Sequence, residues 1–427
     1  MSNPRKAVIS ALIKLENDGG YSNLSLNALI NGSDFSNVDK GFISRLFYGV
    51  IERKITLDYY ISKISKRPIK KLSAFILNAL RTALYQIEYM DKIPDSAAVN
   101  ETVKIVKSSK ENYASGYVNG CLRSFLREKP QLPDGNSPKD YSVKYSCPEW
   151  FISELIDYVG CENAIAFLED SLTPPPVYAR VNTRKITKSD LLEKYPELFT
   201  DAPFENALTV CDASGIENRE AYKNGFFHIE DIASQIAVSA LAIKDGESVL
   251  DICAAPGGKT ATAAQYTPSG RVLSCDIYPK RVKLIREKAQ LLSLNNITTA
   301  VNNAEVFSDK FPLFDKIICD VPCSGFGVIR RKPEIKYKPI EELTNLTSLQ
   351  YNILETTAKY LKPGGILMYS TCTLRKAENE ETVEKFLKNH KEFSVLKSAE
   401  NVRLLPNKNF SDGFFYTIII KETSEDE

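Results

Sequence analysis

The chain has 427 residues, of which 43% are hydrophobic and 26% are charged, and its net charge is +1. This length exceeds that of one average domain and predicts two or three globular domains, while the near-zero net charge says nothing about partners. Residues 1–130 nevertheless hold 20 Lys and Arg against 12 Asp and Glu, a net charge of +8. Such a basic segment is compatible equally with RNA or DNA binding and with a solvated surface.

Simple counts exclude several classes of protein. The chain contains no run of about 18 apolar residues, the length that is needed to span a bilayer. No apolar leader follows residues 1–6. The nine cysteines include no CxxC pair, and His228 and His390 are the only histidines. We therefore expect a cytoplasmic protein with reduced thiols, without a disulfide framework, a metal site or a membrane association.

The N-terminal third has the pattern of a helical bundle. Apolar residues recur three and four positions apart, and strand-type alternation is absent. Helices are expected around residues 7–13, 42–51, 72–87, 97–107 and 117–125. The basic segment 63–71 joins two of these helices, and it suits an RNA contact and a solvated turn equally well.

The next hundred residues are mixed. Lys129–Pro138 holds three prolines and a glycine, which is the composition of a linker. Helices around 150–158 and 164–168 are expected after it, followed by a break and a strand within 173–182. We predict a helical domain over 1–130, a linker and small α+β subdomain over 131–230 that extends the substrate surface, an α/β domain over 231–421, and an acidic tail over 422–427.

From residue 231 onward, strand and helix patterns alternate, which predicts a parallel sheet built from βαβ units. Strands are expected at 248–252, 271–276, 297–301, 317–320 and 365–370, with helices at 279–292 and 341–361 between them. A final strand over 412–420 is expected to be antiparallel at the end of the sheet. The predicted fold class is therefore α + α/β, with a Rossmann-like C-terminal domain.

The first turn of this domain has the residues of a cofactor site. Small residues, Cys253 to Lys259, lead from the first strand into a helix, so a ligand can approach the backbone. Asp276 ends the second strand, where an acid can bind ribose hydroxyls. The turn is neither GxGxxG nor a phosphate-binding loop. An adenosine ligand without phosphates, such as S-adenosylmethionine, fits better. Asp251, at the end of the first strand, could have a structural role and hold the turn without touching the ligand.

Two thiols and a carboxylate follow two later strands. Asp320 ends one strand and Cys323 follows it, and Cys372 follows another strand. Ligands bind beyond the carboxyl ends of such strands. A lone cysteine is usually a core residue, as we expect for Cys275 and Cys319. Two thiols beside an acid instead suit methylation at carbon 5 of cytosine, because a thiolate adding to C6 activates C5, while an acid donates a proton near N3.

Several motifs now support a resemblance. Segments 42–50, 83–87, 98–103 and 116–123 resemble a NusB-like RNA-binding domain. Segments 249–260, 320–325 and 369–373 resemble RNA cytosine-5 methyltransferases. Together they resemble the bacterial RsmB (Sun, Fmu) family. That resemblance implies a monomeric enzyme that methylates a cytosine of 16S rRNA, of the position-967 class, through a covalent Cys–C6 adduct.

The resemblance also implies roles for particular residues. Cys372 would be the nucleophile, Cys323 would assist product release, and Asp320 would lie between cofactor and cytosine. S-adenosylmethionine would be held by a set of residues from the first three strand ends: Cys253, Ala254, Ala255, Pro256, Gly257, Gly258, Lys259, Asp276 and Asn303, together with Asp320. Asn303 departs from the family's usual Asp near the adenine. Arg330, Arg331 and Lys332 would meet RNA phosphates, with a solvated loop as the alternative.

Two other functions fit the same residues. One is cytosine methylation of transfer RNA, of another RNA or of DNA, because the motifs do not name the nucleotide. The other is a non-catalytic RNA-binding or antitermination factor that keeps the fold. The intact cysteine pair speaks against this factor, since a pure binder has no use for two exposed thiols.

Overall fold

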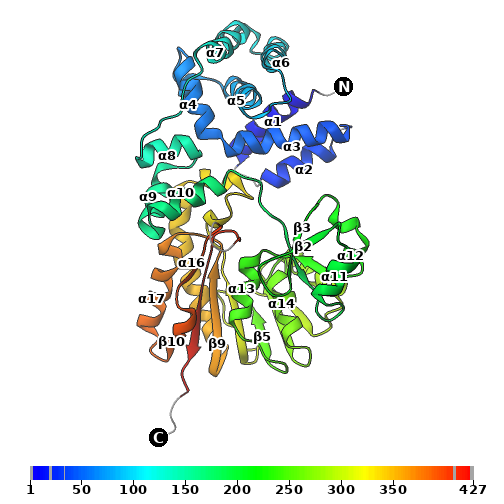
Figure 1. Cartoon of the computed structure of the whole chain (residues 1–427). Coiled ribbons are helices and arrows are strands. Elements are labelled where there is room, and N and C mark those ends of the chain that lie inside the picture. Colours follow the sequence, from blue (N-terminus) through cyan, green and yellow to red (C-terminus); the bar gives the residue numbers. More distant parts are fainter. Residues whose placement is uncertain (1–2, 19–21, 33, 407–409, 424–427) are drawn as a thin grey trace. The chain divides into compact units, whose positions relative to one another are not determined.

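The computed structural model describes residues 3–18, 22–32, 34–406 and 410–423, and the acidic tail expected at 422–427 lies largely outside this part. The chain forms two compact units (Figure 1). One comprises Met1–Asp157 and Arg331–Tyr337, and the other comprises Tyr158–Arg330 and Lys338–Glu427. Among the described residues, no helix is both long and apolar enough to cross a membrane.

The first unit is helical, as the apolar periodicity predicts. Its helices are α1 (Pro4–Asp18), α2 (Ser22–Asn31), α3 (Asn37–Glu52), α4 (Lys54–Ile64), α5 (Ala74–Tyr89), α6 (Asp95–Lys107), α7 (Ser115–Glu128), α8 (Pro138–Tyr145) and most of α9 (Glu149–Val159). Serine side chains cap several helices, and Ser73, for example, accepts a hydrogen bond from Ile76 N at the start of α5. Helix α8 and most of α9 also belong to this unit. The domain boundary that was expected after residue 130 stays a prediction.

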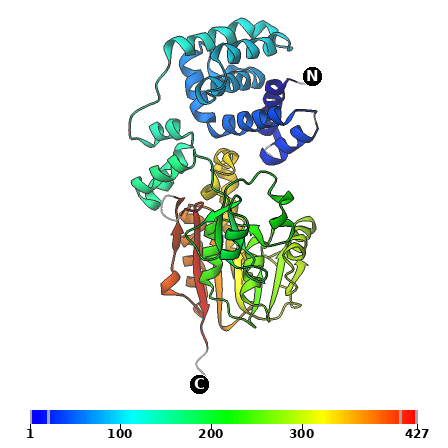
Figure 2. The ribbon, with the colours of Figure 1, turned by 45° about the vertical axis from the view of Figure 1, so that its right-hand side comes forward.

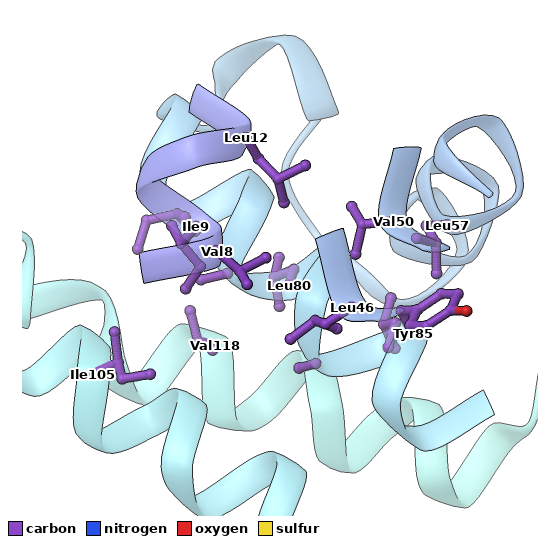
Figure 3. Packing of buried hydrophobic residues seen from close by; sticks show 14 of the residues in the cluster. Val8, Ile9, Leu12, Leu46, Val50, Leu57, Leu80, Tyr85, Ile105 and Val118 are labelled. Atoms are coloured by element: carbon purple, nitrogen blue, oxygen red, sulfur yellow. The ribbon is translucent and has the colours of Figure 1, made fainter. Parts of the chain in front are cut away.

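The core of this unit lies between α1, α3, α5 and α7 (Figure 3). Leu46 and Leu80 are completely buried there. Gly49 allows α3 to approach α5, because a Cβ at this position would come within 1.9 Å of the Tyr85 ring. A side chain at residue 49 would therefore push the two helices apart, which explains the glycine in the NusB-like segment 42–50.

The buried side chain of Arg81 lies inside this bundle. Arg81 on α5 is only 4% exposed, and it donates to both oxygens of Asp58 at 2.6 and 2.7 Å and to Glu16 at 2.8 Å. A buried guanidinium without partners would be strongly destabilising. The carboxylates of α1 and α4 are therefore held against α5 by this ion pair network.

A short segment from the C-terminal half of the sequence packs into the helical unit. Lys336 Nζ donates to Glu52 O at 2.7 Å, and the Tyr337 hydroxyl donates to Ile51 O at 2.7 Å. Burial lowers the pKa of Lys336 to about 8. The sequence pattern did not predict this packing. The alternation of apolar Pro333, Ile335 and Tyr337 is the signal that could have indicated it.

The second unit begins with α10 (Cys161–Asp170) and a small antiparallel sheet. The sheet has the order β2-β3-β1-β4, with β1 (Tyr178–Val181), β2 (Phe199–Asp201), β3 (Ala207–Val210) and β4 (Phe227–Ile229). Helices α11 (Lys188–Lys194) and α12 (Glu220–Lys223) accompany it. The expected α+β character is confirmed, but the sequence patterns identified only β1. The other strands are three or four residues long, too short for alternation to be recognised.

A large sheet forms the rest of this unit. Its order is β10-β12-β9-β8-β5-β6-β7, and β11 also pairs with β12. The strands are β5 (Ser248–Asp251), β6 (Arg271–Asp276), β7 (Ile297–Val301), β8 (Phe314–Asp320), β9 (Leu361–Thr371), β10 (Phe393–Val395), β11 (Val402–Leu404) and β12 (Phe414–Lys421). Strands β5 to β9 run parallel, and β12 is antiparallel to β9 as expected. The prediction that β12 ends the sheet is wrong, because β10 and β11 pair with it. Figure 2 shows β12 in red beside β9.

Helices cover both faces of this sheet (Figure 1). They are α13 (Ile232–Ala240), α14 (Gly258–Tyr266) and α15 (Pro279–Leu292) on one face, and α16 (Ile340–Ala358) and α17 (Glu380–Asn389) on the other. Along β8, Ile317 and Cys319 pack toward α16 while Ile318 packs toward α13. This two-residue alternation buries both faces of the strand and leaves its end as the place for polar side chains.

Candidate active site

The two loops that follow β8 and β9 bring two thiols together. The strands pair in parallel with Asp320 opposite Ser370, so both chains leave the sheet at the same edge. Cys323 Sγ and Cys372 Sγ are 3.3 Å apart. Gly327 N donates to Cys372 O at 3.0 Å and ties the first loop to the second. The candidate cysteines are therefore neighbours, and both are partly exposed.

The short distance between the two sulfurs affects the ionisation of the thiols. The hydrogen bond with Cys372, together with burial, raises the pKa of Cys323 well above its ordinary value. Two thiolates at this distance would repel each other, so the pair loses its first proton more easily than its second. The arrangement therefore favours no more than one thiolate in the pair.

Asp320 is held by two donors. Lys259 Nζ lies 2.8 Å from Asp320 Oδ2, and Ser370 Oγ donates to Oδ1 at 2.8 Å. Burial alone would lower the pKa of Lys259, but the nearby carboxylate of Asp320 outweighs it and raises that pKa. The sequence patterns did not predict this ion pair. The parallel register of β8 and β9 is what places Ser370 beside Asp320.

The turn between β5 and α14 contains the small residues that were expected to bind a cofactor. Ala254 N donates to Cys275 O at 2.8 Å, and Arg281 donates to Ala255 O at 2.9 Å; the Ala255–Pro256 peptide is cis. Gly257 has a φ of 90°, a conformation that favours glycine. A Cβ on Gly258 would lie 3.1 Å from Glu230 Oε1. The small residues thus keep a space open beside the first turn of α14.

That space is a cavity of about 180 Å³. Its lining includes Glu230, Asp251, Cys253, Lys259 and Asp320. Among the described residues, Glu230 Oε1 and Asp251 Oδ1 are buried without a hydrogen-bond partner. Two unsatisfied carboxylate oxygens suit a ligand that brings donors or positive charge. The sequence patterns did not single out Glu230. Its position beside the cavity depends on β4 lying next to the turn.

Asp251 combines a structural contact with this free oxygen. Its Oδ2 accepts a hydrogen bond from Thr260 Oγ1 at 2.6 Å, so it does hold the turn. The side chain is 1% exposed, and burial raises the pKa of Asp251 to about 7. The folded protein therefore retains a proton on this carboxyl in a range where the unfolded chain has lost it.

Replacing Asp251 tests this shift. Between pH ~4 and ~7 the folded state binds more protons than the unfolded state, so the contribution of Asp251 to stability is lost as the pH rises. Asp251→Asn keeps the acceptor for Thr260 and should remove this loss, which amounts to roughly 1–4 kcal/mol of unfolding free energy. Urea unfolding of both proteins from pH 4 to 8 measures it. Parallel curves for the two proteins would contradict the raised pKa.

The other expected cofactor residues end β6 and β7. Asp276 is 3% exposed; its Oδ1 accepts from Tyr278 N at 3.1 Å, and its Oδ2 lies 3.2 Å from Arg281. Asn303 is exposed, and its Oδ1 accepts from Glu305 N at 3.1 Å. Each oxygen of Asp276 keeps a second lone pair for a ribose hydroxyl. The contact between Asn303 and an adenine stays a prediction.

The three basic residues after the Cys323 loop fall in different places. Arg330 donates to Thr173 O, Thr173 Oγ1 and Pro174 O at 2.6 to 3.0 Å, so it anchors the loop before β1. Arg331 and Lys332 belong to the segment of the helical unit. Lys332 is exposed there. Contact of these residues with RNA phosphates stays a prediction, and the contacts of Arg330 show a structural role that the sequence did not indicate.

No group of three or more His, Cys, Asp or Glu side chains suited to a metal occurs within residues 3–18, 22–32, 34–406 and 410–423. His228 instead lies 3.3 Å from Glu230, and burial lowers the pKa of His228. His390 lies 3.2 Å from Glu355.

Comparison with known proteins identifies the same regions. Family models match at residues 238–420 (16S rRNA methyltransferase RsmB/F), 2–127 (NusB family) and 147–201 (RsmF/B-like ferredoxin-like domain). The chain is 36% identical to “Probable ribosomal RNA small subunit methyltransferase B” of Bacillus subtilis, covering 96% of this chain and 97% of that one. It is 29% identical to ribosomal RNA small subunit methyltransferase B of Pectobacterium atrosepticum, covering 93% and 94%.

Solved structures show the same architecture. The structure titled PH0851 covers 98% of this chain and 99% of its own, with a TM-score of 0.80 at 24% identity, and so supports the fold. A methyltransferase homolog from Pyrococcus horikoshii is 28% identical and has a TM-score of 0.59 over 67% of this chain and 99% of its own. The full-length match to the Bacillus protein and the three family models lead to one conclusion: the chain belongs to the RsmB/F family of 16S rRNA methyltransferases.

Proposed function

We propose that this protein methylates carbon 5 of a cytosine in 16S rRNA, at the site of the position-967 class, with S-adenosylmethionine as methyl donor. The observation that carries the proposal is the pair of thiols 3.3 Å apart at the ends of β8 and β9. Carbon 5 of cytosine is too weak a nucleophile to take a methyl group directly. A thiolate that adds to C6 overcomes this, and a second thiol has a use only if the adduct must later be released.

The residues of this chain divide the chemistry between them. Cys372 Sγ bonds to C6 of a cytosine swung out of its stack. The Asp320–Lys259 pair supplies a proton toward N3. Lys259 already donates an ammonium proton to Asp320 in a hydrogen bond of 2.8 Å. C5 then takes the methyl group, and N3 returns its proton to the Asp320–Lys259 pair. Once Cys372 is bonded to C6 it carries no charge, so the Cys323 thiol can lose its proton to water. The Cys323 thiolate takes the proton from C5, the C6–S bond breaks, and Cys372 leaves as a thiolate.

The cavity beside the turn fits S-adenosylmethionine. This cofactor carries a sulfonium and an ammonium group, and the cavity offers the buried, unsatisfied oxygens of Glu230 and Asp251. Gly258 leaves the backbone open to close approach, and Asp276 stands at the end of the next strand. When bound, the cofactor supplies an electrophilic methyl group. In this proposal the protein acts in the cytoplasm as a monomer.

Asp276→Ala tests the ribose contact. Losing charge-assisted hydrogen bonds to the ribose hydroxyls should weaken S-adenosylmethionine binding by ~1.5–3 kcal/mol. Isothermal titration calorimetry measures the affinity. Glu287→Ala removes an acid whose side chain is 54% exposed on α15 and serves as the matched control. Equal affinities of all three proteins would show that Asp276 does not bind the cofactor.

The helical unit is proposed to bind RNA. Lys66, Lys70 and Lys71 are exposed in the basic connection between α4 and α5. Their triple replacement by Ala should raise KM for rRNA and lower the slope of log affinity against log salt by about 2, at ~0.7 for each lost phosphate contact. Filter binding at several salt concentrations measures the slope.

A second triple variant provides the control for charge. Lys92, Lys107 and Lys110 are also exposed on the helical unit, so their replacement changes the net charge equally. It should alter the slope less. If both triple variants reduce the slope by the same amount, the contribution is general electrostatics and the connection between α4 and α5 is not a specific RNA contact.

The function itself is tested in cells and in vitro. Bisulfite sequencing of 16S rRNA from a deletion strain should show one unprotected cytosine, and the purified protein with S-adenosylmethionine should restore its protection. Protection lost from a transfer RNA instead would assign the enzyme to that substrate. RNA binding without any methyl transfer would support the non-catalytic factor.

A further inference from the structure

A buried carboxylate lies between the two cysteine loops. Glu378 ends the short helix η6 (Lys376–Glu378), which follows the Cys372 loop, and its side chain is completely buried. None of the steps proposed above uses it. A buried acid is costly unless donors surround it, so its partners indicate what it does.

Glu378 holds the residues on both sides of Cys323. Its Oε2 accepts from Ser324 N at 2.8 Å and from Gln350 Nε2 at 2.9 Å. Gln350 Nε2 also donates to Pro322 O at 3.0 Å. The residue before Cys323 and the residue after it are thus both tied to one carboxylate.

The next residue does the same for Cys372. Asn379 is completely buried; its Oδ1 accepts from Thr371 Oγ1 at 2.6 Å, and its Nδ2 donates to Thr373 O at 3.1 Å. The loops also meet directly, because Ser324 Oγ and Thr373 Oγ1 are 2.8 Å apart. Two consecutive side chains therefore fix the neighbours of both thiols.

We propose that Glu378 is a positioning residue which, with Asn379, sets the distance between the thiols of Cys323 and Cys372. The inference rests on the proposed function for its catalytic consequence, but the distance itself is independent of it. Every side-chain partner of Glu378 is a donor, since Arg375 donates to its Oε1 at 3.1 Å. A glutamine would turn an NH₂ group toward one of these donors, so the clamp needs the charged carboxylate.

The distance can be measured without any substrate. Diamide takes up the two electrons and two protons released when neighbouring thiols form a disulfide, and the rate of that reaction depends on how often the sulfurs meet. We expect rapid Cys323–Cys372 disulfide formation in the wild-type protein, followed by mass spectrometry of the linked peptides. In Glu378→Gln the rate should fall about 10- to 100-fold, as for a loss of one charge-assisted hydrogen bond.

The same variant should be slow in methyl transfer. A displacement of about 1 Å at a reacting group costs roughly 100-fold in rate, so kcat should fall by 10- to 100-fold while KM for rRNA and the Kd for S-adenosylmethionine stay unchanged. The Glu378 side chain is bonded to Ser324, Gln350 and Arg375, and none of these is a proposed cofactor residue. Glu381→Gln is the matched control, because the Glu381 side chain is 55% exposed and its ion pair with Lys376 is long, at 4.0 Å. The rates of disulfide formation and of methyl transfer should equal those of the wild-type protein.

A second variant guards against loss of folding. Gln350→Met keeps the volume of the side chain but removes both hydrogen bonds that Gln350 donates, and it should slow disulfide formation and kcat together. Wild-type rates of both reactions in Glu378→Gln, or in Gln350→Met if the first variant does not fold, would overturn the proposal. A wild-type protein that forms the disulfide rapidly but transfers no methyl group would overturn the proposed function and leave the clamp intact.

Discussion

Cys323→Ala is expected to accumulate a covalent protein–RNA adduct, whereas Cys372→Ala is expected to form none. In the proposed mechanism Cys372 makes the bond to C6, so its loss should lower methyl transfer by about 10⁴-fold or more, as for removal of a catalytic nucleophile. In the same mechanism Cys323 acts after methyl transfer. Without its thiol the enzyme should attack and methylate the cytosine once, and then fail to release it.

A denaturing gel with rRNA and S-adenosylmethionine distinguishes these outcomes, because a stalled adduct migrates as a slow band. The band should be strong for Cys323→Ala and absent for Cys372→Ala and for the double variant. Cys319→Ala provides the matched control, because Cys319 is completely buried on the neighbouring part of β8. It should show no stalled band and retain turnover.

The reverse pattern has a clear meaning. A strong band from Cys372→Ala alone would make Cys323 the nucleophile, and the raised pKa of the Cys323 thiol would then have to be overcome by the bound substrate. Full activity of both single variants would remove the pair from the mechanism. The 3.3 Å separation of the sulfurs is compatible with either order of roles. The family resemblance favours Cys372 as the nucleophile.

The second large effect is expected for Asp320→Asn. The amide would place an NH₂ group toward Lys259 or toward Ser370, both of which are donors. It would also break the proposed path of the proton to N3. A positioned proton donor contributes roughly 10²–10⁴-fold to a rate, so kcat should fall by that factor. Single-turnover kinetics with saturating rRNA measures the chemical step.

Asp315→Asn is the control for this variant. Asp315 lies on the same strand and also accepts from a lysine, Lys362, at 2.7 Å, but it is at the opposite end of β8. Its replacement should lower stability without changing the single-turnover rate. Equal rates for Asp320→Asn and the wild-type protein would show that Asp320 carries no proton in the reaction.

Local patterns determined much of this fold. The helix expected at 279–292 and the strand expected at 297–301 match α15 and β7 residue for residue. Apolar periodicity and Pro or Gly boundaries are properties of a few neighbouring residues, so they can be recognised in the chain itself. The same holds for the glycine turn before α14, for Asp320 at the end of its strand, and for Cys323 and Cys372 after their strands.

Other features depend on residues that are distant in the chain. The sequence could place Cys323 and Cys372 at strand ends, but only the parallel register of β8 and β9 makes them neighbours. The ion pair of Lys259 with Asp320 joins two different strand ends in the same way. The packing of residues 331–337 into the helical unit and the pairing of β10 with β12 were missed for this reason.

The role of Glu378 is the clearest case. In the sequence it is one acid among many, near the start of a helix with acidic neighbours, and such a charge usually faces solvent. Its complete burial and its bond to Ser324 N arise because β8 and β9 lie side by side and α16 covers them. The sequence determines which side chains are present. Packing between residues that are distant in the chain decides which donors surround a carboxylate.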